Sequence, residues 1–433
     1  MKRSNTSARA HNILATYIDR VRSFHPNARL YLLSVILTGA GLGVYRLLFN
    51  FYVLSLGYDE ALLGTLITTS SLTALLAALP MGYLVDIIGH KPALIIGGLV
   101  VSAAIAGMVF FPSALTFVLM NIVIGLAQSL AGVTMGPFLM ENSGEKERTY
   151  LFSFSSGLQM ASAFFGNWVG GYLPTWMSGM QGSTPTSPDA YAWSLAAIAL
   201  AGAAGAVPLF FLRTPRISHE ARSVFAPLSY FKQHSRLLGR LILPMLVTSL
   251  GAGLIMPFMN VFFRNVHNQP DPVIGAMFAW GSLAMGVGLL IAPPLADRYG
   301  KIQVVVITQA LSIPFLFALG FAPWFAISAA AYYVRLTLMN MSLPVYQTFV
   351  MERVDVSARA TVASLVSMAN NVGWAFSPQI SGWLQVRYGF QPAFIATLVL
   401  YIISIFLYWR YFWYPDQKTA RARSVQPSPQ NRI

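Results

Sequence analysis

The sequence predicts an all-α membrane protein whose chain crosses the bilayer twelve times, in two parallel six-helix halves. Composition is the first reason, because 56% of the 433 residues are hydrophobic and only 10% are charged, whereas soluble domains carry about 25% charged residues. The second reason is a series of apolar runs, each long enough to span a membrane. The third is a one-sided distribution of basic residues. Together these features exclude a soluble enzyme and a disordered chain, and the lack of cysteine excludes disulfides and thiolate metal sites.

Twelve apolar runs define the expected spans, since a membrane helix needs about 20 mostly apolar residues. They lie near residues 30–56, 62–85, 92–111, 114–140, 149–177 and 191–212, and near 241–263, 273–296, 302–321, 324–350, 360–386 and 392–412. We therefore expect six-helix halves at 30–212 and 241–412, joined by a linker at 213–240. Tails at 1–29 and 413–433 complete the chain, and the stretch 11–24 has the helical spacing of a segment that lies on the membrane surface.

Basic residues set the expected orientation. Of the Lys and Arg side chains outside the spans, 24 fall in the two tails, the linker and the loops on one side, and only Arg264 and Arg387 fall on the other. Because positive charge is retained on the cytoplasmic side, both termini and the linker are expected in the cytoplasm and the protein in the plasma (inner) membrane. The net charge of +14 is then explained by the membrane topology of the chain, so no nucleic-acid partner is expected. Residues 1–29 lack the apolar core of a signal peptide.

The two halves repeat at an offset of 211 residues. Five matched pairs illustrate this repeat: Asp86 and Asp297, Gly89 and Gly300, Glu141 and Glu352, Arg148 and Arg359, and Gly171 and Gly382. Six spans per copy is an even number, so the copies share one orientation and are expected to be related by an axis along the membrane normal.

The loop between the second and third spans carries a specific motif. Residues 82–91 read GYLVDIIGHK, which is similar to the G-x-L-x-D-x-x-G-[RK]-[RK] signature of the major facilitator superfamily, and residues 293–301 carry a weaker copy. With twelve spans in two halves, the chain resembles that family over residues 30–412. We interpret the motif charges as a cytoplasmic latch or, alternatively, as charges that only solvate helix ends. The latch residues are Gly82, Asp86, Gly89, Lys91, Glu141 and Arg148 in the first copy, and Asp297, Arg298, Gly300, Lys301, Glu352 and Arg359 in the second.

The fifth and eleventh spans carry small residues that are similar to the family's G-x3-G-P-x2-G-G helix-packing motif. The first copy contains Gly166, Gly170 and Gly171, with Asn167 in place of the proline, and the second contains Gly373, Pro378 and Gly382. In the resembled family this motif implies export, which the Asn167 substitution weakens.

Ionisable residues are almost absent at membrane depth. Every acid and histidine lies in a tail, a loop or a helix end, so the spans offer neither a general base nor metal ligands, and we expect no enzyme, metal or cofactor. Arg46 and Arg335 are the exceptions, each about 16 Å from the outer edge at 1.5 Å per residue. The resemblance places both on cavity-lining helices. Each arginine either binds an anionic substrate group or serves as a structural strut bonded to neighbouring carbonyls and amides.

Neutral polar residues complete the expected binding site. Asn50 lies four residues from Arg46, and Asn260 is the repeat partner of Asn50. Asn121 occupies the place of an arginine found in many proton-coupled exporters of the resembled family. We therefore expect Arg46, Asn50, Asn121, Asn260 and Arg335 to bind substrate, although the asparagines could equally hold helices together.

The function expected from these features is secondary transport by alternating access. The favoured substrate is a small organic or amphipathic solute with an anionic group, export is slightly favoured over uptake, and coupling to an ion gradient leaves no visible residue. The transporter is expected to be monomeric in the lipid bilayer. Alternatives are a multidrug efflux pump for apolar or cationic compounds, and a lipid flippase or non-transporting assembly factor on the same fold.

Overall fold

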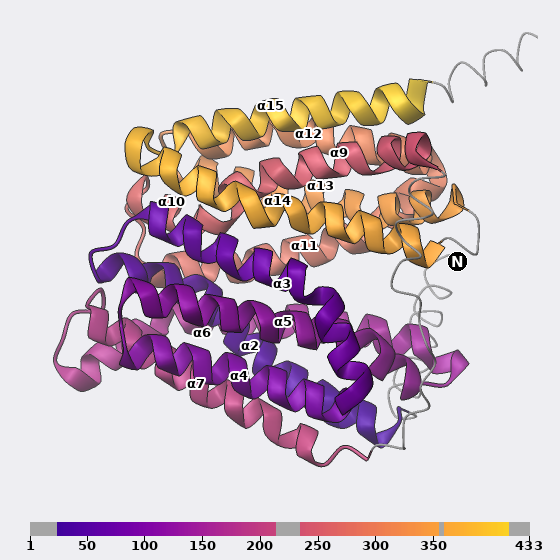
Figure 1. Ribbon diagram of the computed structural model, residues 1–433. Helices are drawn as coiled ribbons and strands as arrows, with labels where there is room; N and C mark the ends of the chain where they lie inside the picture. Colours follow the sequence, from indigo (N-terminus) through magenta and orange to yellow (C-terminus); the bar gives the residue numbers. More distant parts are fainter. Residues whose placement is uncertain (1–23, 214–233, 355–358, 415–433) are drawn as a thin grey trace, which may run out of the picture. The chain divides into compact units, whose positions relative to one another are not determined.

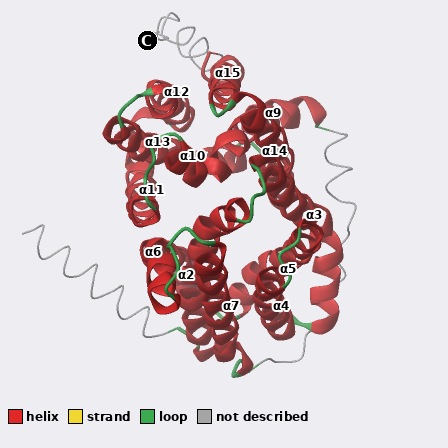
Figure 2. Cartoon of the chain, turned by 90° about the vertical axis from the view of Figure 1, so that its left-hand side faces the viewer, coloured by secondary structure: helices red, strands yellow, loops and turns green. Residues whose placement is uncertain are grey.

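The computed structural model describes residues 24–213, 234–354 and 359–414, and within these ranges every regular element is a helix (Figures 1 and 2). The predicted tails and linker fall largely outside them, as does most of the surface stretch 11–24. The first half contains α2 (Pro26–Ser55), α3 (Glu60–Ile88), α4 (His90–Phe110), α5 (Ala114–Glu141), α6 (Glu145–Gln181) and α7 (Pro188–Phe210).

The second half begins with a broken span. It consists of α9 (Ser235–Ile255), a 3-10 turn (Met256–Phe258) and α10 (Met259–Asn265). Next come α11 (Asp271–Tyr299), α12 (Lys301–Phe321), α13 (Phe325–Glu352), α14 (Arg359–Tyr388) and α15 (Gln391–Tyr408), which ends in a π-helical turn (Trp409–Trp413). Each predicted apolar run corresponds to one helical span, so the predicted fold class is confirmed.

Nine of the spans in the described ranges are long and apolar enough to cross a membrane by composition alone. The three helices outside that set are α6, α13 and α14, which carry more polar residues such as Gln159, Asn340 and Asn370. A membrane helix that faces protein or a cavity tolerates such residues, whereas a lipid-facing one does not.

Single glycines allow two very tight connections. Gly89 separates α3 from α4 with φ of 90°, and its repeat partner Gly300 separates α11 from α12 with φ of 93°. Side chains with a Cβ rarely adopt this conformation. The motif glycines therefore allow two successive helices to be separated by a single residue.

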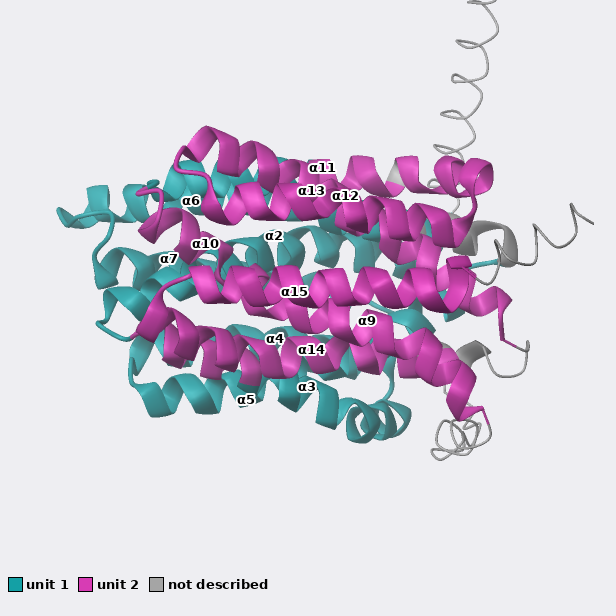
Figure 3. Ribbon diagram, turned by 90° about the horizontal axis from the view of Figure 1, so that it is seen from above, with its two compact units in different colours: residues 1–58, 69–221, 269–283 teal, residues 59–68, 222–268, 284–433 magenta. Residues whose placement is uncertain are grey.

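The described chain forms two compact units (Figure 3). Unit 1 comprises residues 24–58, 69–213 and 269–283, and unit 2 comprises 59–68, 234–268, 284–354 and 359–414. In unit 1, α2 packs on α6 and α7, and α4 packs on α5 and α7. In unit 2, α9 packs on α14 and α15, and α12 packs on α13. Both units thus contain a helix bundle in which parallel pairs, such as α2 with α6, and antiparallel pairs, such as α4 with α5, pack together.

Each unit also contains a short segment from the other half of the sequence. In unit 1, Asp271 at the start of α11 accepts a hydrogen bond from the Tyr191 hydroxyl at 2.7 Å, and Trp280 packs edge-on against Phe164 at 5.8 Å. In unit 2, the Thr68 hydroxyl of α3 accepts a bond from the Gln379 backbone at 3.2 Å. The compact units therefore differ from the two sequence halves at these segments.

Candidate functional site

Unit 1 encloses a cavity of about 380 Å³ between α2, α4, α5, α6 and α7. Most of its wall is apolar or glycine. Three polar side chains are exposed on its surface: Arg46 of α2, Gln128 of α5 and Gln159 of α6. The bundle therefore contains a largely hydrophobic chamber with one cationic group, a combination that suits an organic solute.

Arg46 has no polar partner within the described part of the chain. Its side chain is surrounded by protein atoms and yet accessible through the cavity. Among the described residues no carboxylate pairs with it and no acceptor hydrogen-bonds to it. A guanidinium at membrane depth costs at least about 2.5–3.5 kcal/mol, so this geometry leaves five N–H donors available to a ligand.

Arg335 lies in a different environment in unit 2. Its side chain is only 2% exposed. Its guanidinium donates to the Tyr401 hydroxyl at 2.9 Å and to the Met256 sulfur at 3.4 Å, and it lies 5.4 Å from the Tyr401 ring centroid, where the ring quadrupole attracts a cation. Arg335 thus joins α13 to α15 and to the break after α9, as a strut does.

The predicted asparagines do not line this cavity. Asn121 is 3% exposed and donates to the Phe117 carbonyl at 2.8 Å, one turn back on its own helix. Asn50 and Asn260 are also buried, at 5% and 3% exposure. Of the five predicted substrate-binding residues, Arg46 alone lines the unit 1 cavity.

Sequence reasoning missed Gln128 and Gln159 as cavity residues. Their amides have no hydrogen-bond partner among the described residues, and both face the same cavity as Arg46. The signal available in the sequence was a glutamine inside an apolar helix, but such a residue equally often holds helices together.

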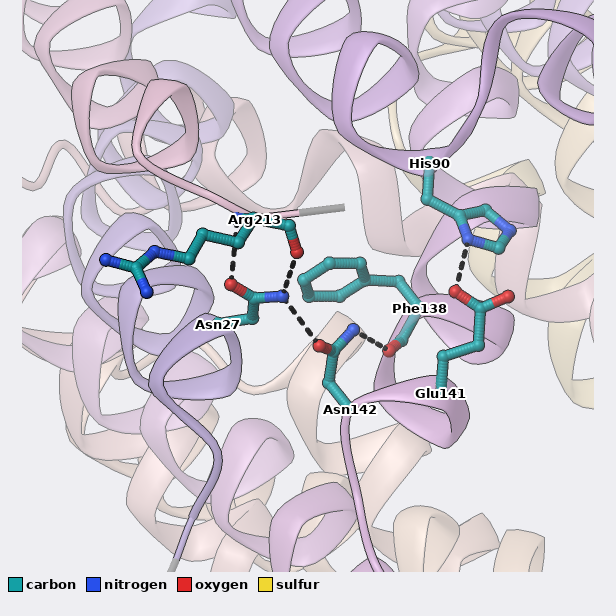
Figure 4. A network of polar contacts seen from close by, with 6 residues as sticks. All are labelled: Asn27, His90, Phe138, Glu141, Asn142 and Arg213. Atoms are coloured by element: carbon teal, nitrogen blue, oxygen red, sulfur yellow. Dashed lines mark hydrogen bonds and ion pairs between the residues drawn. The ribbon is translucent and has the colours of Figure 1, made fainter. Parts of the chain in front are cut away.

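The first motif copy pairs a histidine with an acid. His90 Nδ1 lies 2.9 Å from Glu141 Oε2 (Figure 4). Lys91, one of the predicted latch residues, donates to the Phe210 and Leu212 carbonyls at 2.7 and 2.8 Å, at the carboxyl end of α7. There it satisfies carbonyls that the helix cannot bond internally.

The second motif copy pairs Lys301 with Glu352. Lys301 is the repeat partner of His90, so the same contact joins α4 to α5 in unit 1 and α12 to α13 in unit 2. Asp86 and Asp297 are exposed, and within the described ranges neither forms a hydrogen bond or ion pair. Gly82 belongs to the first motif copy and lies on α3, and Arg298 belongs to the second and lies 5.2 Å from the Tyr299 ring centroid. The side chains of Arg148 and Arg359 fall outside the described set. The latch stays a prediction.

An asparagine network closes the same end of unit 1. Asn27, 3% exposed, donates to the Asn142 side chain at 2.9 Å and to the Arg213 carbonyl at 2.6 Å, and it accepts from the Arg213 backbone at 3.0 Å (Figure 4). It thus links the start of α2 to the ends of α5 and α7. The repeat partner of Asn27 is Leu238, so the internal repeat of the sequence did not point to Asn27.

The small-residue motifs bring helix backbones together. A Cβ at Gly166 would collide with the backbone of Ala40, and one at Gly170 would lie 3.0 Å from Val44. In the second copy, Gly373 abuts Ser249. These contacts join α6 to α2 and α14 to α9. Gly171 and Gly382 contact the exchanged segments, at Asp271 and Glu60, and Pro378 contacts Gly64. No cluster of His, Asp or Glu able to hold a metal occurs among the described residues.

Comparison with known proteins identifies the class. The family model described as Major Facilitator Superfamily matches residues 31–270 and 241–432. The chain therefore belongs to the major facilitator superfamily, and it is a multi-pass membrane transporter of small molecules rather than an enzyme.

Individual relatives are distant. Multidrug resistance protein MdtG of Dickeya zeae is 23% identical over 191 residues, which is 41% of this chain and 44% of that protein, so the match spans less than half of the relative. The nucleoside transporter NupG superposes with a TM-score of 0.72 at 15% identity, covering 89% of this chain and 99% of NupG. A bacterial homologue of the lysosomal transporter Spinster gives 0.71 at 13% identity, covering 88% and 95%. These likenesses establish the fold.

Proposed function

We propose that this protein is a secondary transporter whose substrate is a small organic anion bound at Arg46. The observation that carries the proposal is the Arg46 guanidinium, which lines the unit 1 cavity without a counter-charge among the described residues. A planar guanidinium binds a carboxylate or phosphate through two parallel hydrogen bonds. The glutamine amides on the same cavity can add neutral donors.

Direction, location and assembly are further parts of the proposal. The basic-residue bias supports an inner-membrane protein with both termini in the cytoplasm. The MdtG relative, named for multidrug resistance, and the small-residue motif of α6 support export. We propose a monomer that needs neither cofactor nor nucleic acid, with transport energy drawn from an ion gradient.

Paired arginine variants test the substrate charge. Thermal stabilisation of the purified protein is measured across panels of organic anions, organic cations, sugars and lipids, because a ligand that binds the folded state raises its stability. For an anion that stabilises the parental protein, we expect Arg46→Gln to lower the affinity roughly 10- to 150-fold, as expected for losing charge-assisted hydrogen bonds of about 1.5–3 kcal/mol. Arg46→Lys should rescue poorly, because an ammonium lacks the planar fork.

Arg335→Gln is the matched control, since it removes the same charge from a position already bonded to Tyr401. It should leave the anion affinity unchanged and alter only stability. Normal anion binding by Arg46→Gln would contradict the proposal.

A second candidate is efflux of apolar or cationic drugs, which the MdtG similarity favours. The apolar wall of the cavity is compatible with such compounds, but Arg46 would repel a cation. Stabilisation by organic cations alone, at equal strength in the parental protein and in Arg46→Gln, would establish this alternative.

A further inference from the structure

The unit 1 cavity is elongated along the helices. Its lining on α2 runs from Tyr31 to Arg46, which corresponds to about 22 Å at 1.5 Å per residue. The cavity has a volume of about 380 Å³. Its lining extends from the level of Arg46 toward the end where Asn27 joins α2, α5 and α7.

The unit 1 cavity has few exposed polar side chains. They are Arg46, Gln128 and Gln159. Its lining on α4 and α7, called the recess below, consists of small and apolar residues: Gly97, Gly98, Ile105, Ile198, Ala206 and Leu209. Glycine and alanine at these positions leave room that larger side chains would occupy.

Two hydroxyl groups of the cavity lining are bonded within their own helices. Ser102 donates to the Gly98 carbonyl at 3.1 Å, and Thr38 donates to the Ser34 carbonyl at 2.8 Å. The recess therefore offers a ligand mainly apolar contact, and the exposed polar side chains of the cavity are Arg46 and the two glutamines.

We propose that the unit 1 cavity binds a single-chain amphiphilic anion, with its carboxylate or phosphate head at Arg46 and its alkyl chain in the recess between α4 and α7. This inference rests on the proposed function for its anionic head, and the recess adds the tail. The cavity volume of about 380 Å³ favours one chain over two. A free fatty carboxylate and a lysolipid-type alkyl phosphate share this chemistry.

A chain-length series tests the tail. Straight-chain carboxylates from butyrate to myristate, and the matching alkyl monophosphates, are titrated against the full-length protein in lipid nanodiscs, with empty nanodiscs as the partition control. We expect affinity to rise about fourfold per added methylene until the recess is full and then to level off. The series with the higher affinity at equal chain length identifies the headgroup.

Two glycines of α5 give a matched pair of variants. Gly132 lines the cavity, and a Cβ there would meet nothing within 4 Å; Gly136, one turn further on, is equally unobstructed and lies outside the cavity lining. Gly132→Leu should weaken myristate binding at least tenfold and leave butyrate binding unchanged, because the leucine side chain would fill space that the methylene groups of the longer ligand occupy. Gly136→Leu should behave like the parental protein.

A smaller substitution at a second glycine provides a test that does not depend on the folding of Gly132→Leu. A Cβ at Gly98 would lie 3.8 Å from the Ala206 Cβ, an ordinary contact inside the recess. Gly98→Ala should therefore fold and bind myristate about fourfold more weakly, the equivalent of one methylene.

The possible failures are distinguishable. Equal affinity for butyrate and myristate, or parental binding of myristate by both Gly132→Leu and Gly98→Ala, would overturn the recess and leave the anion site intact. Alkylammonium ions that bind as tightly as the carboxylates would overturn the anionic head, and with it the proposed function, whereas a chain-length dependence in that series would preserve the recess.

Discussion

At the scale of single residues, two arginines that look alike in the sequence lie in different environments. Both were expected at matched depth, and both are far from any acid in the sequence. The Arg335 guanidinium donates a hydrogen bond to Tyr401, a residue 66 positions away on another helix, whereas Arg46 lines a cavity. Sequence spacing predicts which residues share a helix face, but it does not predict partners supplied by distant helices. The candidate site was therefore predictable only in part.

His90 and Lys301 occupy the same repeat position, and each contacts an acid on the following helix, Glu141 and Glu352 respectively. Both acids are about half exposed, so solvent screens the two pairs. We therefore expect the His90–Glu141 contact to contribute no more than about 1 kcal/mol to stability.

Thermal unfolding of the parental protein, Glu141→Gln and His90→Lys under the same conditions measures this contribution. Glu141→Gln should lower the stability by no more than about 1 kcal/mol, whereas His90→Lys should keep the contact, as Lys301 does with Glu352. Unchanged stability in Glu141→Gln would show that the contact is inert.

At the scale of elements, α6 contains glycines with opposite packing requirements. Gly166 abuts the backbone of Ala40 on α2, whereas Gly179 has nothing within 4 Å of a built Cβ. Gly166→Ala should destabilise the protein by about 1–3 kcal/mol, because the two backbones must separate. Gly179→Ala should be neutral or stabilising by up to about 1 kcal/mol, through helix propensity. Chemical denaturation of the purified variants measures both, and equal effects would contradict close packing at Gly166.

The connection between α10 and α11 contains a histidine among aromatic rings. His267 lies 5.3 Å from Phe262, 5.8 Å from Phe263 and 6.0 Å from Phe325, centroid to centroid. Burial lowers the pKa of His267 below its ordinary value, because the charged form is desolvated. The fold therefore favours the neutral ring, so stability is full above the unfolded pKa and falls as the pH drops through the lowered one.

His267→Phe should keep the aromatic packing and remove this acid-dependent loss. Melting temperatures from about pH 7 down to about pH 4 measure it, within the range where histidine titrates. Equal acid sensitivity in parental and variant proteins would place the titrating group elsewhere.

At the scale of the whole molecule, the sequence predicted the helices well because bilayer thickness imposes a length and an apolar composition on each span. The run near 114–140 corresponds to α5 at 114–141. What it did not predict were the break between α9 and α10, and the division of the chain into units that exchange residues 59–68 and 269–283. Both depend on long-range packing, which local hydropathy does not encode.

Orientation is a testable property of the whole chain, and the absence of native cysteine makes the test direct. Thr186 is exposed in the turn between α6 and α7. A cysteine introduced as Thr186→Cys should react with a membrane-impermeant maleimide added outside the cell, and one introduced as Asp416→Cys should react only after the membrane is opened. The reverse pattern would contradict the predicted topology.

The exchanged segments also constrain the order in which the protein is assembled during synthesis. Domains generally fold as units in the order in which they leave the ribosome. Unit 1, however, needs residues 269–283, where Asp271 accepts a hydrogen bond from Tyr191. The amino-terminal bundle thus stays incomplete until α11 has been translated and inserted. Tyr191 of α7, for example, gains its hydrogen-bond acceptor only after a further 80 residues have been synthesised.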